Sequence, residues 1–242
     1  MLADQRILVI GGSSGMGLAI ARAAVVAGAR VMIAARDEAR LARAAAQAGG
    51  AATPHRLDIT DERAVAAFFD SMDHPIDHLV VTAHASSVVT GAIDTLAGMS
   101  IAAARAFMET KFWGPFVVAK HGQRRLAPRG SIVLFSGAAG ARKLLPNHTA
   151  IGATNGAVEA FARQLAREIA PRRVNVIAAG LVRTPAYDRL AEEARERMYA
   201  DYERTSLVGR VGRPEDIAEA AIYLMSSPYV TGQVHEIDGG RP

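Results

Sequence analysis

Short apolar runs alternate with longer alanine-rich segments of helical period along the whole chain. Runs that are apolar throughout predict strands covered on both faces, as in a parallel sheet between two layers of helices. The expected strands are Arg6–Ile10, Arg30–Ala34, His55–Leu57, His78–Thr82, Ser131–Phe135, Val174–Ala178 and Val234–Ile237. The expected helices cover about Gly15–Ala27, Glu38–Ala48, Asp61–Met72, Ile101–Gly122, Thr154–Ile169, Ala186–Arg204 and Glu215–Met225. This order predicts a three-layer α/β sandwich around a parallel sheet of about seven strands.

The chain shows no internal repeat, no low-complexity linker and no break in composition. Its 242 residues suit one α/β domain, since three-layer folds commonly exceed the usual size of a single domain. Half of the residues are hydrophobic, which is enough to fill a large core. We therefore expect residues 1–242 to form one domain.

Charge and cysteine content exclude several classes of protein. The net charge is only +4 and the arginines are spread out, so a basic patch that binds nucleic acid is not expected. The absence of cysteine excludes a disulfide framework, a thiol nucleophile and a cysteine-ligated metal, and we predict no metal site. No signal peptide and no membrane-spanning apolar stretch are evident, so we expect a cytoplasmic protein that does not bind membranes.

A glycine-rich turn follows the first expected strand and opens the first expected helix. Within it, Gly11 allows a tight turn, Gly15 lets backbone amides approach a pyrophosphate, and Gly17 allows the helix to pack closely on the strand. The amino end of the helix adds unpaired N–H groups and a favourable dipole. The turn therefore predicts a dinucleotide site formed by Gly11, Ser13, Ser14, Gly15, Met16 and Gly17.

The end of the second expected strand indicates which dinucleotide binds. An acidic residue there would hold a ribose 2′-hydroxyl, whereas a cation is needed for a 2′-phosphate. Arg36 occupies this place and can hold a phosphate through two hydrogen bonds, which favours NADP(H) over NAD(H). Asp37 is expected to cap the following helix. The alternative is that Arg36 is only a surface charge.

Several segments in the right order resemble the short-chain dehydrogenase/reductase family over nearly the whole chain. They are the glycine-rich turn, Val158-Glu159-Ala160-Phe161, Val174–Thr184, Gly209–Ala218, Val230–Gln233 and Asp238-Gly239-Gly240. The resemblance implies a Rossmann-type fold and an NADP(H)-dependent oxidoreductase. It also implies a homo-oligomer, a tetramer built through the helices expected at Ile101–Gly122 and Thr154–Ile169.

The resemblance also assigns further cofactor contacts. It places Asp58 and Ile59 against the adenine ring, Ala83 close to the cofactor, and Gly180, Leu181, Val182 and Thr184 around the carboxamide and pyrophosphate. Asp58 serves equally well as a turn or cap residue. His84 stands where the family usually has glycine, as a proton donor or, preferably, as a solvent-facing loop residue.

Four side chains carry carbonyl reduction in this family: a Ser, a Tyr, a Lys and an Asn. The resemblance aligns Ile151 with the Tyr, Asn155 with the Lys, Lys111 with the Asn and Gly137 with the Ser. Ser136 is adjacent to Gly137, and a shift of one residue in the loop would restore the Ser. Asn155 can still hydrogen-bond the ribose hydroxyls. Neither Ile nor Asn delivers a proton as the Tyr–Lys pair does.

Other groups are candidates to assist in their place. Lys111 and Ser136 are the candidate catalytic residues, and His148 is a weaker one. Each has an ordinary alternative: Lys111 reaching solvent or an oligomer groove, Ser136 satisfying backbone groups, and His148 lying on a surface loop. The segment 183–207 should form a loop and helix that close over the substrate. Its tyrosines are Tyr187, Tyr199 and Tyr202, and they are expected mainly to pack on this segment.

These positions favour some reactions over others. Loss of a positioned general acid typically costs about 10²–10⁴ in rate, so we expect a poor reductase of plain ketones. Hydride transfer to an iminium, an imine or a conjugated carbonyl asks less of the protein, because the cofactor carries the chemistry. The apolar closing segment suggests a small, largely hydrophobic organic substrate. The alternatives are a non-catalytic NADP(H)-binding or regulatory protein, and a non-redox lyase, isomerase or cyclase.

Overall fold

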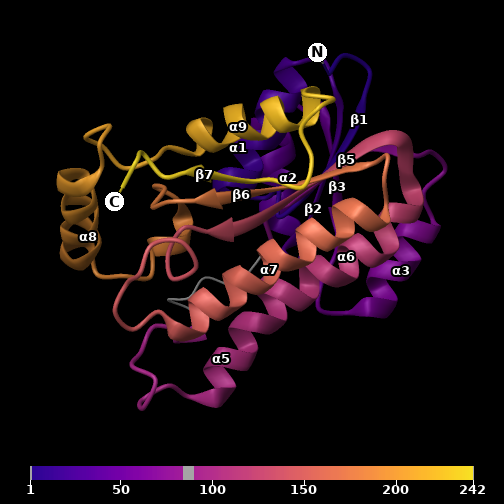
Figure 1. The fold of residues 1–242 in the computed structure, drawn as a ribbon. Coiled ribbons are helices and arrows are strands. Elements are labelled where there is room, and N and C mark those ends of the chain that lie inside the picture. The colour runs from indigo at the N-terminus through magenta and orange to yellow at the C-terminus, as the bar shows by residue number, and fades with distance from the viewer. Residues whose placement is uncertain (1, 84–89, 242) are drawn as a thin grey trace.

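The computed structural model describes residues 2–83 and 90–241, so the prediction about His84 falls outside the described residues. Within these ranges, seven strands form one sheet in the order β3-β2-β1-β4-β5-β6-β7 (Figure 1). Every neighbouring pair is parallel. The strands are β1 (Arg6–Ile10), β2 (Arg30–Ala35), β3 (Ala52–Arg56), β4 (Ile76–Val81), β5 (Leu126–Gly137), β6 (Arg173–Ala179) and β7 (Val234–Ile237).

Helices cover both faces of the sheet (Figure 1). One layer holds α1 (Gly15–Val26), α2 (Glu38–Gln47) and α9 (Pro214–Ser226). The other holds α3 (Glu62–Asp70), α6 (Gly114–Gly122) and α7 (Thr149–Glu168). In β1, Ile7 and Val9 pack into the first core while Leu8 and Ile10 pack into the second. The predicted three-layer α/β fold is therefore confirmed, and its physical basis is that each central strand is apolar on both faces.

The segment expected as one helix over Ile101–Gly122 is continuous but changes its hydrogen-bonding pattern. α5 spans Ile101–Met108, a π-helical turn spans Glu109–Trp113, and α6 begins at Gly114. A π turn is rare, occurs mostly as a single turn inside an α-helix, and is frequent at functional sites. Lys111 is the middle residue of this turn, and hydrophobic periodicity gives no sign of it.

Some predicted boundaries were wrong. β3 spans Ala52–Arg56 rather than His55–Leu57, because it is an edge strand that pairs only with β2 and tolerates Pro54. α7 begins at Thr149, before the expected start at Thr154. α8 spans Glu192–Thr205, after a short 3-10 turn at Pro185–Tyr187. Among the described residues, no helix has both the length and the apolar character needed to cross a bilayer.

Strands β2 and β3 lie on one side of β1, and β4 to β7 lie on its other side. The strand order therefore reverses between β1 and β4. In open α/β sheets, ligands bind beyond the carboxyl ends of the strands at such a reversal. Gly11 follows β1, Arg36 follows β2, Ala83 lies two residues after the end of β4, and Gly180 follows β6. The fold therefore brings these predicted cofactor residues together at the carboxyl ends of the strands.

Candidate functional site

The glycine-rich turn packs against the end of β4. Gly11 has a φ of +92°, and a Cβ built on it would lie 2.6 Å from the backbone nitrogen of Ala83. Gly15 has a φ of +53°, a conformation that favours glycine. A Cβ on Gly17 would overlap the carbonyl oxygen of Gly11. The three glycines fit the predicted turn. A side chain on Gly11 or Gly17 would collide with backbone atoms, and the positive φ of Gly15 favours glycine.

The amino end of α1 keeps its first amides open. Ser14 is the N-cap residue, with extended backbone and no side-chain hydrogen bond to the helix. The first amide groups of an α-helix have no partner inside the helix, so they are free to receive a phosphate. Ser13 precedes the cap in the turn, and Met16 in the first helical turn lines the large cavity described below.

Arg36 and Asp58 carry opposite charges at the ends of β2 and β3. Arg36 is exposed, and no ion pair involving its side chain is found among the described residues. The Asp58 carboxylate accepts hydrogen bonds from the amide and hydroxyl of Thr60, at 3.0 and 2.8 Å. Burial alone raises the pKa of Asp58, but these hydrogen bonds and the Arg36 charge lower it overall. Asp58 is therefore a turn residue whose carboxylate already has donors.

Two neighbouring expectations concern Asp37 and Ile59. Asp37 is the N-cap of α2, and its carboxylate accepts the amide of Arg40 at 2.9 Å, as predicted. Ile59 is buried against Gly114, where a Cβ on the glycine would lie 2.5 Å from the Ile59 Cδ1 atom. The side chain of Ile59 thus fills the core beneath α6.

A cavity of about 660 Å³ lies beyond the carboxyl ends of β5 and β6, between α7 and α8. Among the predicted site residues it is lined by Met16, Lys111, Ser136, Ile151, Asn155, Gly180, Leu181, Val182 and Thr184. The remaining ones are not part of its wall: Gly11, Ser13, Ser14, Gly15, Gly17, Arg36, Asp58, Ile59 and Ala83. The structure therefore joins the candidate catalytic positions with one part of the predicted cofactor set.

Asn155 lies on the cavity side of α7 and is only 2% exposed. Its Nδ2 atom donates to the carbonyl oxygen of Ala139 at 3.0 Å, while its Oδ1 atom is buried without a partner. A Cβ built on Gly137 would lie 3.1 Å from the Asn155 Nδ2 atom. An unpaired buried acceptor is costly, so Oδ1 marks a place where a ligand hydroxyl would be stabilising.

Lys111 reaches the same cavity from the π-helical turn. Its side chain is buried, and Nζ donates to the carbonyl oxygen of Ser136 at 3.3 Å. Burial lowers the pKa of the Lys111 amine to about 8. Ile151 packs with Phe107 and Ala92 in a small apolar cluster next to it. The cavity thus holds a buried amine beside apolar side chains.

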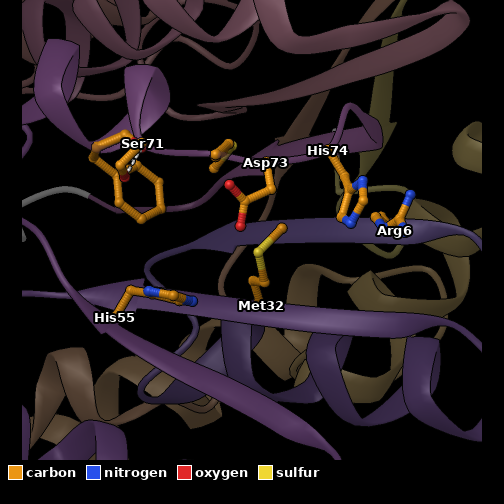
Figure 2. Close-up of a pocket in the computed structure, with 8 residues that line it drawn as sticks. Arg6, Met32, His55, Ser71, Asp73 and His74 are labelled. Atoms are coloured by element: carbon orange, nitrogen blue, oxygen red, sulfur yellow. Dashed lines mark hydrogen bonds between the residues drawn. The ribbon is translucent and has the colours of Figure 1, made fainter.

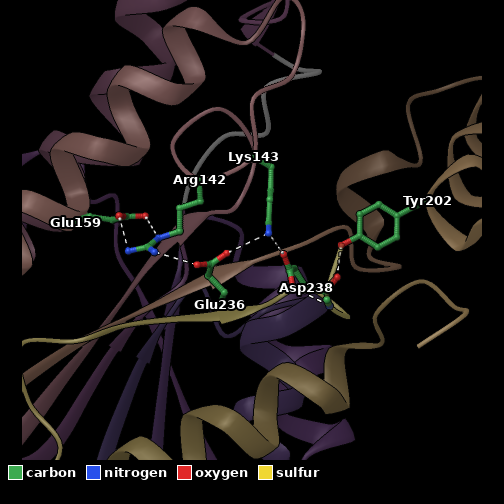
Figure 3. A network of polar contacts seen from close by, with 7 residues as sticks. Arg142, Lys143, Glu159, Tyr202, Glu236 and Asp238 are labelled. Atoms are coloured by element: carbon green, nitrogen blue, oxygen red, sulfur yellow. Dashed lines mark hydrogen bonds and ion pairs between the residues drawn. The ribbon is translucent and has the colours of Figure 1, made fainter. Parts of the chain in front are cut away.

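The Ser136 hydroxyl has a partner outside the cavity. It donates to the Glu159 carboxylate at 3.0 Å. The Arg142 guanidinium lies 3.2 Å from the same carboxylate (Figure 3). Arg142 also contacts Glu236 at 3.0 Å. Sequence reasoning missed this group. The available signal was Glu159 itself, a charged residue in the buried stripe of α7 that includes Val158.

A second part of the network closes the cavity on the side of β7. The Lys143 amine lies 3.6 Å from Glu236 and 3.7 Å from Asp238 (Figure 3). The Tyr202 hydroxyl donates to the backbone carbonyl of Asp238 at 2.7 Å. Lys143, Tyr202 and Asp238 all line the cavity. These contacts tie α8 to the end of the sheet.

The tyrosines of the closing segment mainly pack, as expected. The rings of Tyr187 and Tyr199 meet edge to face with centroids 6.2 Å apart, and Tyr199 and Tyr202 are buried. Burial, together with the nearby Tyr199 and Tyr202, raises the pKa of Tyr187 to about 12. A phenol with this pKa is a weak proton donor near neutral pH.

His148 lines the cavity just ahead of α7. Its Nδ1 atom lies 2.7 Å from the carbonyl oxygen of Pro146. A carbonyl only accepts, so Nδ1 donates in this contact and Nε2 is left for a ligand. His148 is therefore a candidate to contact a ligand in the cavity.

A smaller cavity of about 250 Å³ lies away from these residues (Figure 2). Arg6 at the start of β1, His55 on β3 and His74 before β4 belong to its wall. None of the predicted site residues lines it. The larger cavity, at the carboxyl ends of the strands, is therefore the candidate functional site.

Comparisons with known proteins agree with this geometry. Residues 11–241 match the family model described as Enoyl-(Acyl carrier protein) reductase. A short-chain dehydrogenase/reductase from Stachybotrys chlorohalonatus, ATR9, is 33% identical over 98% of this chain and 96% of its own length. The Inactive 2-(S)-hydroxypropyl-CoM dehydrogenase 2 of Xanthobacter autotrophicus is 36% identical over 91% of this chain and 98% of its own. A small-chain dehydrogenase crystallised in complex with NADPH is 32% identical, with 98% of each chain covered and a TM-score of 0.84. The chain therefore belongs to the short-chain dehydrogenase/reductase family.

Proposed function

We propose that this protein is an NADP(H)-dependent oxidoreductase that transfers hydride to an activated acceptor, an iminium, an imine or a conjugated carbonyl. The observation that carries the proposal is the pairing of Asn155 and Ile151 in one cavity. Asn155 offers an unpaired buried acceptor to a ribose hydroxyl, which supports cofactor binding. Ile151 stands where a proton donor is expected, which argues against plain ketone reduction.

The chain's own residues fit a nicotinamide dinucleotide. The open amides at the start of α1 and the tight contacts of Gly11 and Gly17 leave room for a pyrophosphate. Arg36 would hold the 2′-phosphate, and Asp58 with Ile59 would border the adenine. Ala83, Gly180, Leu181, Val182 and Thr184 would border the rest of the cofactor, together with Ser13, Ser14, Gly15 and Met16. When bound, the cofactor supplies the hydride.

The cavity offers limited help to a developing alkoxide. Lys111 is a candidate to place a positive charge near a substrate oxygen, since among the described residues its Nζ is bonded to a backbone acceptor and to no carboxylate. Ser136 would assist only if its hydroxyl left Glu159. An iminium carries its positive charge before hydride arrives and needs no proton during delivery. A conjugated carbonyl needs only stabilisation of the enolate oxygen, which the Lys111 ammonium can give.

The closing segment 183–207 would cover a small, largely hydrophobic substrate. Apolar residues contribute much of the cavity wall, including Ile93, Phe107, Leu145 and Met198. Arg183 lies over the Tyr199 ring with its Cζ atom 4.1 Å from the centroid, which holds the start of the segment on α8. Closure over the substrate would exclude water from the reacting atoms.

The first experiment is a titration of the purified protein with NADPH and NADH, followed by nicotinamide fluorescence. We expect NADPH to bind more tightly than NADH and Arg36→Ala to remove most of the difference, because the 2′-phosphate loses its cation. Arg43→Ala, which removes an exposed arginine on α2, is the matched control and should change little. Absence of binding by both nucleotides would refute the redox proposal.

The second experiment follows deuterium from NADPH labelled at C4 into a panel of acceptors. Iminium salts, cyclic imines, conjugated enals and enones, and saturated ketones form the panel. We expect deuterium in an activated acceptor, with saturated ketones slower by about 10²-fold or more. Equal rates for ketones and activated acceptors would contradict the proposed acceptor class.

A non-catalytic NADP(H)-binding protein is the second candidate. Ile151 favours it, and the Xanthobacter autotrophicus relative is itself named inactive. This candidate predicts NADPH binding with no deuterium transfer to any acceptor. A lyase, isomerase or cyclase would instead turn over without nucleotide, and its rate would not depend on the oxidation state of the cofactor.

A further inference from the structure

The chain uses lysine very sparingly. Lys111, Lys120 and Lys143 are the three lysines in its sequence, and the other 25 of its 28 basic Lys and Arg residues are arginines. The two residue types differ chemically, because arginine keeps its proton in proteins whereas a buried lysine can lose it and act as a nucleophile. The position of each lysine is therefore informative.

The three lysines lie in different surroundings. Lys120 is exposed, and its Nζ forms an ion pair with Glu62 at 2.7 Å. Lys143 lines the large cavity but lies between the carboxylates of Glu236 and Asp238. Lys111 is buried in the same cavity, and no carboxylate contacts it among the described residues. Lys111 alone of the three combines burial, access to the cavity and the absence of a charged partner.

The surroundings of Lys111 favour the neutral amine. Its neighbours in the cavity wall include the apolar side chains of Phe107, Ile151 and Ile93. Among the described residues, Nζ donates to the carbonyl oxygen of Ser136, a neutral acceptor that can accept from an amine as well as from an ammonium. Burial lowers the pKa of this amine to about 8, so a large fraction is neutral under mildly basic conditions.

We infer that Lys111 is a nucleophilic lysine that forms a Schiff base with an aldehyde or ketone bound in the cavity. The lone pair of Nζ attacks the carbonyl carbon, and the C=O π electrons move to oxygen to give a carbinolamine. Both amine hydrogens then leave with that oxygen as water, and a C=N bond remains. The step is balanced without any oxidant or reductant, and water reverses it.

This inference goes beyond the proposed function, since the addition needs no cofactor. It also connects the two classes of hydride acceptor proposed above, because a conjugated carbonyl compound bound to Lys111 would become an imine or iminium. A conjugated aldehyde or ketone held as a Schiff base on Lys111 becomes a conjugated iminium when its nitrogen takes a proton from water, and the iminium is a stronger hydride acceptor than the free carbonyl compound. The chemical class of ligand that Lys111 selects is therefore a conjugated aldehyde or ketone of largely apolar character.

The test traps the Schiff base on the full-length protein without nucleotide. Cinnamaldehyde is added at pH 8 with sodium cyanoborohydride, which converts the C=N bond into a stable secondary amine. Peptide mass mapping then compares modification at Lys111, Lys120, Lys143 and the amino terminus. We expect Lys111 to be modified at least about tenfold faster than Lys120 or Lys143, because its amine is neutral more often.

Two variants provide matched controls. Lys143→Arg removes the other lysine of the cavity and should leave the trapping at Lys111 unchanged, whereas Lys111→Arg should abolish it. Modification that is equal at all three lysines, or that concentrates on Lys143, would overturn the inference. The peptide mass map of the unmutated protein shows which lysine is modified even if the Lys111→Arg protein fails to fold. Since nucleotide is absent, failure here is distinguishable from failure of the NADPH titration.

Discussion

The Asn155 amide gives its Nδ2 hydrogen to the carbonyl oxygen of Ala139 at 3.0 Å, which leaves its Oδ1 atom buried and unpaired. A buried acceptor of this kind costs about 1–3 kcal/mol when it stays unsatisfied. A ligand hydroxyl in the cavity would remove that cost. Oδ1 is therefore the acceptor that the proposed ribose contact of Asn155 would use.

Asn155→Leu should weaken NADPH binding about five- to tenfold, because one hydrogen bond of about 1 kcal/mol to a ribose hydroxyl is lost. Fluorescence titration gives the dissociation constant. Gln164→Leu, which changes an exposed amide on the same helix, should leave it unchanged. Equal affinities for the Asn155→Leu protein and the unmutated protein would show that Oδ1 does not contact the cofactor.

Restoring the family's residues should restore ketone reduction. The triple variant Gly137→Ser, Ile151→Tyr and Asn155→Lys places a hydroxyl, a phenol and an amine at three positions of the cavity wall. We expect the rate of NADPH-dependent reduction of a saturated ketone to rise about 10²–10⁴-fold, the usual contribution of a positioned general acid. The change in NADPH absorbance measures it.

The matched control replaces Tyr by Phe at the same position, giving Gly137→Ser, Ile151→Phe and Asn155→Lys. The ring volume is kept and the hydroxyl is lost, so this variant should remain inactive toward ketones. Equal activity of the Tyr and Phe variants would mean that position 151 does not supply the proton.

His78 makes the stability of the fold depend on pH. Its ring lies between the Ser131 hydroxyl at 2.7 Å and the Gln5 side-chain oxygen at 2.8 Å. Burial lowers the pKa of His78 from 6.5 to about 4, and the nearby Arg173 charge acts in the same direction. The unfolded chain binds this proton near pH 6.5 and the folded chain only near pH 4. The stabilisation is therefore fully present above pH 6.5 and is lost as the pH falls toward 4.

Urea unfolding at pH 7 and pH 5 measures this effect. The free energy of unfolding should fall by about 2 kcal/mol between these values on account of His78 alone. His78→Gln keeps a polar side chain without the titration, so the pH dependence should shrink by that amount. An unchanged slope in the variant would assign the pH dependence to other groups.

Aromatic side chains at the end of the π-helical turn, on α6 and on α7 form a candidate subunit interface. The rings of Phe116 and Phe161 have centroids 4.9 Å apart, and Trp113 packs on Phe116 with its side chain 46% exposed. If the protein is a homotetramer, Trp113→Arg should dissociate it, because the new charge would be buried in the contact. Light scattering after gel filtration gives the mass.

Tyr229→Arg is the control for this experiment, since Tyr229 is a fully exposed aromatic residue outside the π-helical turn, α6 and α7. It should leave the mass unchanged. A mass that is the same for the unmutated protein and both variants would place the subunit contact elsewhere or indicate a monomer.

Sequence patterns predicted the three layers and the existence and order along the chain of the seven strands, because these depend on local residue types. The patterns were clearest in the apolar strands β1 and β6 and in the glycine turn at Gly11, where few other local structures are compatible with the residues. The edge strand β3 was harder, because Pro54 and His55 interrupt its apolar pattern. The N-cap role of Asp37 was predicted correctly, since capping depends on a few neighbouring residues.

The orientation of side chains in the cavity could not be predicted in the same way. The Ser136 hydroxyl turns to Glu159 because Arg142 and Glu236 complete a charged group from three separate segments. Such a group depends on tertiary contacts that residue spacing does not encode. The orientation of the Lys111 side chain could not be predicted either, because it depends on the change from α-helical to π-helical hydrogen bonding at Glu109–Trp113.

The π-helical turn at Glu109–Trp113 makes the identity of the residue facing the cavity a question of helical phase. Successive residues of an α-helix are about 100° apart around its axis, so removal of one residue from this turn would rotate α5 relative to α6 by that angle. Lys111 would then be carried around the axis and its place taken by a neighbour. An insertion or deletion of one residue here would thus exchange the amine for another chemical group while the rest of the sheet stayed as it is.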